Sequence, residues 1–292
     1  MDRTVVPPAS WYANLLTCPD CAGPILGDVG LSCSKCGFRD ESGRDLRPQH
    51  PRGFHAILPR TLAISVCDAL REIDTTRPSI TYDGPNAIRD SRELLSEISR
   101  RCTRQNGTVL DLGCGPRDQA APISYLGYSY VGLDYCNANA DLLGDAHSIP
   151  FKDNAFDCVL SYAVLEHLHS PFIAIREVER VLKPGGIFVG TVSQGEPFHE
   201  SFFHHTPWGL LSLVATTDSL RVVRLWEAPD TLWALSRIGR YPRVIRGLLR
   251  TLDCINRRLP LLAPRKMRWP VKDKQLDRLY RSGSLCFVIE RV

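Results

Sequence analysis

The sequence predicts an α/β fold, in which a parallel sheet is covered by helices on both faces. The first observation is that short apolar runs suited to buried strands alternate with helical stretches between about residues 86 and 226. The second is a glycine turn, Gly113-Cys114-Gly115, which follows one of these runs and leads into a helix. A chain of 292 residues with 43% hydrophobic and 23% charged residues can bury a large core without disulfide bonds.

Each expected element follows from its own pattern of apolar and turn residues. Apolar runs of strand length predict strands at 108–112, 130–134, 141–143, 156–162, 187–192 and 221–226. Apolar residues at helical spacing predict helices at 86–101, 119–126, 172–182 and 207–215, the last with Thr206 as N-cap before Pro207. Residues 183–186, Lys-Pro-Gly-Gly, are expected to separate a helix from the next strand. The β-rich run 284–289 is expected to complete the sheet as an edge strand.

The first 45 residues are predicted to form a zinc ribbon. Cys18 and Cys21 make one C-x-x-C pair and Cys33 and Cys36 another, and four thiolates are the ligand set that tetrahedral Zn²⁺ prefers. Because the protein would fill all four positions, the metal is expected to be structural, and the ribbon is a possible docking module for a protein partner. Residues 46–85 are expected to be a linker with a short helix at 61–73, and residues 86–292 the main domain.

Composition excludes several classes of protein. Eleven cysteines, an odd number, do not suggest the disulfide framework of a secreted domain. The sequence shows neither an apolar leader nor an apolar run of membrane-spanning length, so a cytoplasmic location is expected. Thirty-six Lys and Arg against 32 Asp and Glu leave a net charge of +4, which does not by itself call for a nucleic-acid or membrane partner.

One segment departs from this charge balance. Between residues 237 and 272 there are eleven Lys or Arg residues and a single acid, Asp253. The apolar residues of this segment recur at helical spacing, so a helix here would have one apolar and one basic face. The segment lies within residues 228–283, which are expected to form a basic helical insertion that caps an acceptor pocket. Trp226, Trp233 and Leu235 are interpreted as lining of that pocket or as ordinary core.

The glycine turn and two acidic residues indicate a nucleoside site. Gly113 and Gly115 at a strand-to-helix turn allow a ligand to approach backbone N–H groups. Position 118 is Asp where a dinucleotide fingerprint has its third glycine, which argues against a pyrophosphate on this helix. Asp134, at the end of the next strand, can accept hydrogen bonds from both ribose hydroxyls, and Asp145 with the Ala146 N–H can meet an adenine edge.

The chain at this point resembles the class I S-adenosylmethionine-dependent methyltransferases, especially the small-molecule type, which have a Rossmann-like sheet. The matching segments are VLDLGCG at 109–115, VGLD at 131–134, GDAHSIPF at 144–151, DNAFDCVLSYAVLEHL at 153–168 and REVERVLKPGGIFVGTV at 176–192. The resemblance implies that Gly113 and Gly115 bed the methionine moiety, that Asp111 contacts its ammonium indirectly or through the turn, and that Asp134 holds the ribose. Asp145 and Ala146 would take the adenine. Cys114, Tyr135 and Tyr162 complete the expected cofactor-binding set.

The N-terminal cysteine pairs carry a second resemblance. CPDC followed by CSKCG is similar to the zinc ribbons that precede some of these domains, including those of ribosomal RNA guanine methyltransferases.

Candidates for a general base lie on two loops. Glu166 and His167 follow the strand at 156–162, and His204 and His205 precede the helix that begins after Thr206. A base is useful when the methyl acceptor is a hydroxyl, whose proton must leave, and is needed less for a neutral amine. The alternative interpretation is that Glu166 and His167 cap or orient the adjacent helix.

Three functional hypotheses remain open. The leading one is methylation of a small-molecule or lipid-like acceptor at oxygen, nitrogen or carbon. The second is an RNA guanine methyltransferase that grips phosphates with the ribbon and the basic segment. The third is a protein that binds a partner or, through 237–272, an anionic membrane, with catalysis secondary. Ser161-Tyr162-Ala163-Val164 replaces the Asn-Pro-Pro-Tyr motif of exocyclic adenine methylases, and Cys158 inside a strand is poorly placed to attack a pyrimidine.

Overall fold

A computed structural model describes residues 25–26, 32–37, 39, 73–78, 89–102, 106–195, 200–228, 236, 241–258, 278–279 and 282–292. The chain divides into two compact units, Met1–Arg71 and Glu72–Val292. In the first unit β1 (Ile25–Leu26) pairs antiparallel with β2 (Ser32–Cys33). A turn follows in which the Gly37 N–H donates to the Cys33 carbonyl at 3.0 Å. This part of the predicted ribbon therefore forms a small hairpin with a tight knuckle at Cys33-Ser34-Lys35-Cys36.

The other half of the predicted zinc site lies outside the described residues. Cys18 and Cys21 are in the part of the chain that the structure does not describe, as is most of the helix expected at 61–73. Within the described ranges no group of three or more His, Cys, Asp or Glu side chains is arranged to hold a metal ion. The zinc ribbon therefore stays a prediction.

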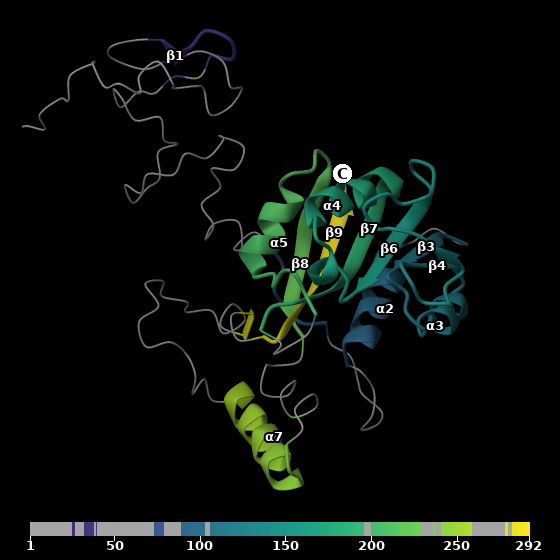
Figure 1. Ribbon diagram of the computed structural model, residues 1–292, viewed down its shortest axis with the longest axis vertical. Helices are drawn as coiled ribbons and strands as arrows, with labels where there is room; N and C mark the ends of the chain where they lie inside the picture. The colour runs from purple at the N-terminus through teal and green to yellow at the C-terminus, as the bar shows by residue number, and fades with distance from the viewer. Residues whose placement is uncertain are drawn as a thin grey trace, which may run out of the picture. The chain divides into compact units, whose positions relative to one another are not determined.

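The second unit is built on a mixed sheet of seven strands, in the order β5-β4-β3-β6-β7-β9-β8 (Figure 1). The strands are β3 (Thr108–Leu112), β4 (Ser129–Asp134), β5 (Leu142–Leu143), β6 (Phe156–Tyr162), β7 (Leu182–Ser193), β8 (Leu220–Glu227) and β9 (Ser284–Arg291). Pairing is parallel from β5 to β7, whereas β9 runs antiparallel to both β7 and β8. The α/β prediction is confirmed, with the sheet mixed where a parallel one was expected.

Helices cover both faces of this sheet. They are α2 (Arg89–Arg101), α3 (Ala120–Tyr125), α4 (Pro171–Val181) and α5 (Pro207–Val214), with a short 3₁₀ turn, η3, at Leu165–His167. Leu94 and Ile98 of α2 and Ile123 of α3 share one core cluster with alternate strand residues such as Leu160 and Val189. Because successive strand residues face opposite sides, the intervening Val159, Phe188 and Phe287, all fully buried, face the layer that contains α4 and α5.

The segment 241–258 contains the helix that its periodicity predicts. This helix, α7, spans Arg243–Arg258. None of the described helices combines the length and the apolar character needed to cross a bilayer.

The expectation for the last strand was wrong. β9, yellow in Figure 1, lies between β7 and β8 and forms no edge. The physical reason is in its burial: Ser284–Ile289 are all buried, which suits a strand with neighbours on both sides. β8 and β5 are the edge strands among these seven, and the exposed Arg221 of β8 fits that place.

Two smaller boundaries also differ from expectation. Residues 183–186 do not separate helix and strand, because β7 already begins at Leu182, pairs with Phe156 and shifts register before Cys158. Residues 73–78, expected in the linker, run beside β8. There the Asp74 N–H donates to Val223 and the Asp74 carbonyl accepts from Leu225 N–H.

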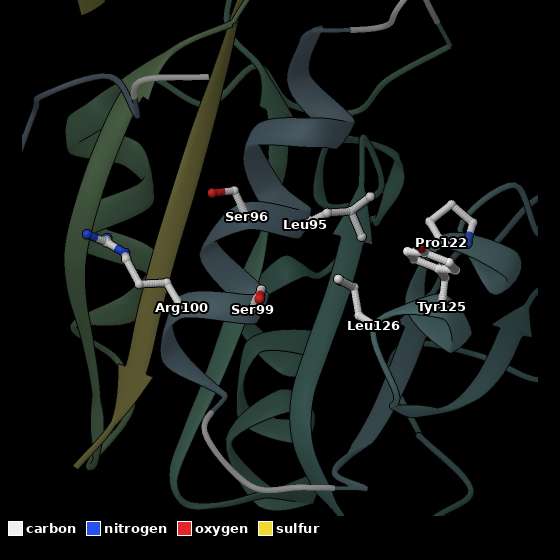
Figure 2. A pocket seen from close by; sticks show the side chains of 7 residues that line it. All are labelled: Leu95, Ser96, Ser99, Arg100, Pro122, Tyr125 and Leu126. Atoms are coloured by element: carbon white, nitrogen blue, oxygen red, sulfur yellow. The ribbon is translucent and has the colours of Figure 1, made fainter. Parts of the chain in front are cut away.

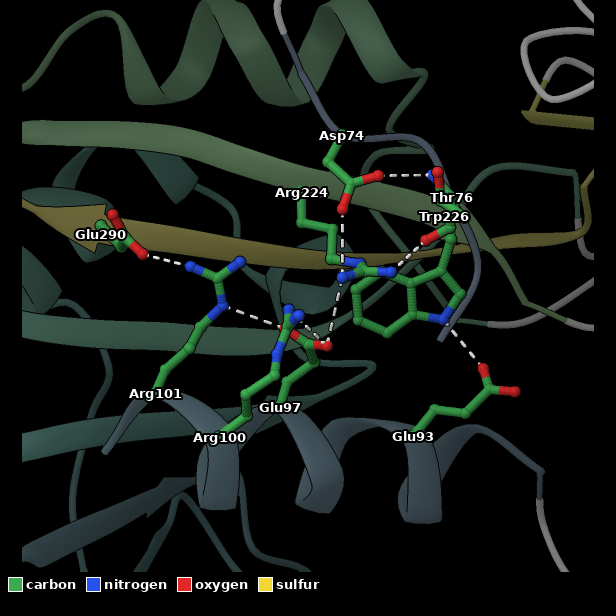
Figure 3. Close-up of polar contacts among 9 residues, drawn as sticks. All are labelled: Asp74, Thr76, Glu93, Glu97, Arg100, Arg101, Arg224, Trp226 and Glu290. Carbon is green, nitrogen blue, oxygen red and sulfur yellow. Dashed lines mark hydrogen bonds and ion pairs between the residues drawn. The ribbon is translucent and has the colours of Figure 1, made fainter. Parts of the chain in front are cut away.

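An ionic network under β8 fixes α2 to the sheet (Figure 3). Arg224 of β8 is 5% exposed and pairs with Asp74 at 3.1 Å and with Glu97 of α2 at 3.5 Å. The Trp226 indole donates to Glu93 at 2.9 Å, with both side chains almost completely buried. Trp226 is therefore core and not pocket lining, while Trp233 and Leu235 lie outside the described residues. Removing one partner of such a buried network costs about 3–5 kcal/mol.

Candidate functional site

The carboxyl ends of the parallel strands β3 to β7 meet at one edge of the sheet, where ligands bind in open α/β folds. The loop after β3 is shaped by two glycines in the left-handed region, Gly113 with φ 75° and Gly115 with φ 50°. A Cβ on Gly113 would collide with the Val164 side chain, whereas a Cβ on Gly115 would meet nothing within 4 Å. Gly113 is thus required by packing, and the space over Gly115 is open to a ligand.

Asp134 joins the loop after β3 to the loop after β4. One carboxylate oxygen accepts from the Gly115 N–H at 2.9 Å, and the other accepts from Cys136 and Asn137 N–H at 3.0 and 2.9 Å. Partial burial acts to raise the pKa of Asp134, but these backbone donors outweigh it and the pKa is lowered. The side chain is therefore an ionised, half-buried carboxylate at the position expected for ribose binding.

Asp111 is a buried carboxylate at the same edge, 2% exposed near the end of β3. Burial raises its pKa to about 6, and the charges of Asp134 and Asp118 add to this effect, although the Tyr130 hydroxyl donates to it at 2.8 Å. Carboxylates that are not fully solvated therefore make the carboxyl end of β3 negative. A cation that comes near would favour the ionised form of Asp111.

Cys114 and Tyr135 differ from each other in exposure. The Cys114 side chain is 7% exposed and sits where a Cβ on Gly132 would fall 2.7 Å from its Sγ, and burial raises its thiol pKa to about 11. Tyr135 is 77% exposed beside Asp134. Cys114 is thus a packing residue beneath the loop, while Tyr135 is accessible to a ligand above it.

The turn after β5 holds Asp145 and Ala146. One Asp145 carboxylate oxygen accepts from the His147 N–H at 2.9 Å and lies 2.6 Å from His147 Nδ1. His147 Nε2 accepts from the Ser170 N–H, so Nδ1 carries the proton of the neutral ring and donates to Asp145. The His147 ring stacks on His169 at 4.2 Å between centroids. Sequence reasoning missed this pair, because the two histidines lie on different loops.

The second group of candidates is brought together by the segment that follows β7. The Glu166 carboxylate, fully buried, accepts from the Ser193 N–H at 3.0 Å, and its backbone carbonyl accepts from Phe202 and Phe203 N–H. His167 Nδ1 lies 2.6 Å from the Glu200 carbonyl. Both residues therefore hold residues 200–203 against η3, whereas the alternative interpretation had them cap or orient the adjacent helix.

His205 and His204, neighbours in sequence, have different environments. His205 is 6% exposed, and its backbone N–H donates to the Ser193 carbonyl at 2.7 Å. Burial lowers the pKa of its imidazole, so the ring is neutral at pH 7. Its Nε2 is buried and makes no hydrogen bond within the described part of the chain. His204 is exposed. The Thr206 cap expected here is present, since its hydroxyl accepts from the Gly209 N–H at 3.1 Å.

The segment that follows β6 contains a residue with a strained backbone. Ala163, between the half-buried Tyr162 and Val164, has φ 54°, and its N–H bonds to Thr191 on β7. An alanine in the left-handed region of φ costs of the order of 1–2 kcal/mol, and such strain clusters at functional sites.

Cys158 is fully buried in β6. Burial raises the pKa of its thiol well above the ordinary value, which removes it as a nucleophile.

A pocket lies away from these candidate residues (Figure 2). It is lined by residues of α2 and α3, namely Leu95, Ser96, Ser99, Arg100, Pro122, Tyr125 and Leu126. Because α3 leads from the loop after β3 back to the start of β4, its last turn lies toward the amino ends of the strands. This pocket is therefore separate from the edge where the candidate residues gather.

Comparison with known proteins agrees with the geometry. The family model described as a methyltransferase domain matches residues 110–190. An uncharacterized 37.1 kDa protein in transposon TN4556 of Streptomyces fradiae is 33% identical over 178 residues, 55% of this chain and 48% of that protein. The chain thus spans about half the length of this relative. The fatty-acid O-methyltransferase of Mycolicibacterium smegmatis is 26% identical over 212 residues, 66% of this chain and 68% of the relative.

Solved structures align with this chain at low sequence identity. The [4+2]-cyclase SpnF aligns with a TM-score of 0.47 and 17% identity over 79% of this chain and 93% of that one. The geranyl diphosphate C-methyltransferase from Streptomyces coelicolor A3(2) aligns with a TM-score of 0.46 and 14% identity over 76% and 87%. The family match contains the end of β3, the glycine loop and Asp134. Residues 110–190 are therefore similar to a methyltransferase domain.

Proposed function

We propose that the protein transfers a methyl group from S-adenosylmethionine to a small-molecule or lipid-like acceptor. The observation that carries the proposal is the negative, poorly solvated end of β3, where Asp111 has a raised pKa and the following loop leaves open space at Gly115. S-adenosylmethionine, when bound, supplies an electrophilic methyl group on a sulfonium and is cationic at its methionine end. The donor set fits it, because a nearby cation offsets the cost of ionising a buried carboxylate.

The neighbouring residues suit the other parts of such a nucleoside. Asp134 keeps acceptor capacity beyond its three backbone bonds, since an ionised carboxylate offers about four lone-pair positions, and it is half-exposed. The remaining position would receive a ribose hydroxyl. Asp145 uses one oxygen for His147, which leaves the other for an adenine amino group beside the Ala146 backbone.

On the acceptor side we assign the base to His205 rather than His204. Its lowered pKa keeps the imidazole neutral, so Nε2 can take a proton from an acceptor hydroxyl as the methyl group is transferred. Glu166 and His167 act as positioning residues, through their contacts with Ser193, Glu200 and the Phe202-Phe203 backbone. Phe202 and Phe203 are 67% and 43% exposed on this segment, which supports an acceptor with apolar surface.

Titration calorimetry with S-adenosylmethionine and with S-adenosylhomocysteine tests the cofactor assignment. Asp134→Asn keeps the shape but loses the charge, and is expected to weaken binding of both by about 1.5–3 kcal/mol, the scale of a charged hydrogen bond. Asp218→Asn, an exposed carboxylate after α5, is the matched control and should bind as the wild type does. Unchanged affinity in Asp134→Asn, or no heat for either ligand in the wild type, contradicts the proposal.

The zinc ribbon is a second part of the proposal. Cys18, Cys21, Cys33 and Cys36 would hold one structural Zn²⁺, and the knuckle at Cys33–Gly37 supports this, because such a turn can aim two thiolates at one centre. Metal analysis of the purified full chain should find stoichiometric zinc in the wild type and in Cys254→Ser. Cys33→Ser should lose it. Equal metal content in the two variants would refute the assignment.

A further inference from the structure

The helix α7 presents apolar side chains to solvent between residues 244 and 255. Val244, Ile245, Leu248, Leu252 and Ile255 are between 37% and 83% exposed. At roughly 100° per residue these five positions fall within an arc of about 100°, the width of a face that normally packs against a core. In this chain the face runs from residue 244 to residue 255 and is open to solvent.

The opposite side of the same helix is basic. Arg243, Arg246 and Arg250 fall within an arc of about 60°, centred about 180° from the middle of the apolar face. Asp253 is the single acid between residues 237 and 272, against eleven Lys or Arg residues in that stretch. A solvated surface helix usually carries both signs of charge, so neither face of α7 has the composition expected of one.

We propose that α7 docks on an anionic lipid surface, with its apolar face in the interface between acyl chains and headgroups and its arginines among the headgroup phosphates. An RNA would engage the arginines but leave the apolar face in water. A second copy of this chain would bury the apolar faces against each other but leave like charges without a partner. An anionic bilayer surface satisfies both faces together, and this amphipathic composition is that of helices that lie in the interface. The docking surface is independent of methyl transfer.

Vesicle co-sedimentation of the full-length protein tests the docking surface. The probes are phosphatidylcholine vesicles with and without phosphatidylglycerol, at low and at high salt. Wild type should sediment with the anionic vesicles, less at high salt, and weakly or not at all with the neutral ones. Arg246→Gln with Arg250→Gln should weaken partitioning by about 25-fold, since each basic residue near the surface contributes about fivefold. Leu248→Glu should abolish binding, because it places a charge in the middle of the apolar face.

Matched variants keep the interpretation unambiguous. Arg176→Gln with Arg221→Gln makes the same charge change at exposed positions on α4 and β8, and Ile173→Glu makes the apolar change on α4. Both controls should sediment as the wild type does. The proposal is overturned if the wild type ignores anionic vesicles or if the α7 variants bind as well as the controls. It is also overturned if Leu248→Glu instead abolishes self-association or tRNA binding without any vesicle binding in the wild type. Calorimetry with S-adenosylmethionine measures binding at the cofactor site independently of vesicle binding.

Discussion

The two halves of the carboxyl edge are built in different ways. Around β3 and β4 the functional carboxylates are fixed by backbone N–H groups that lie close in sequence, as Cys136 and Asn137 are to Asp134. Around β6 and β7 the side chains are fixed by segments about 30 residues apart, as Glu166 is by Ser193 and His167 by Glu200. The first half is thus a local motif that can be recognised in sequence. The second exists only when two distant loops meet, so under the proposed function the acceptor side could change without disturbing the donor side.

The sharpest test of this separation is His205→Gln. Loss of the base is expected to lower kcat by about 10²–10⁴-fold with a hydroxyl acceptor, while affinity for the methyl donor stays unchanged. In the wild type, activity should fall as pH drops through a value below 6.5, since the lowered pKa means that His205 is neutral above it. His204→Gln is the paired control and should change kcat by less than about tenfold. Equal losses in the two variants would refute the assignment of the base.

The two glycines of the first loop sharpen the same comparison from the donor side. Gly113→Ala must accept a left-handed φ and a collision with Val164, so the free energy of unfolding should fall by about 2–4 kcal/mol. The added Cβ of Gly115→Ala meets no neighbour. The free energy of unfolding should therefore fall by only about 1–2 kcal/mol, because the alanine must adopt a left-handed φ. Urea unfolding of both variants measures the difference. Equal destabilisation would show that the contact with Val164 does not constrain the loop.

The smallest expected effect is the pH dependence of donor binding. Asp111 is protonated below a pKa of about 6, so affinity for a cationic ligand should fall by up to about tenfold for each pH unit below that value. In the free protein the sign for stability is opposite. The unfolded chain releases this proton near its ordinary pKa of 3.8 and the folded chain near 6, so stability falls as pH rises between them. Asp111→Asn should flatten both profiles, measured by calorimetry and by thermal unfolding. A slope that persists in this variant must come from another group.

The local sequence pattern was sufficient to predict the elements that neighbouring residues determine. The strands at 108–112 and 156–162 begin and end at the predicted residues, and α5 begins at Pro207 with the predicted Thr206 cap. The local sequence pattern failed where strand pairing or burial depends on residues that are distant in sequence. β9 was expected at the edge of the sheet, yet it pairs on both sides, and periodicity gave no sign that Glu93 and Glu97 are buried against β8.

The amino-acid sequence by itself determined the donor half: the glycines, Asp134 and the turn at Asp145 stand within a few residues of the strand ends that place them, and parallel strands bring those ends to one edge. The tertiary structure alone decided the rest. It separated His205 from His204 by burial, committed Glu166 to holding Ser193, and put Trp226 in the core. The reason is that burial and hydrogen-bond partners are set by chain segments far away in sequence, which periodicity and local motifs do not encode.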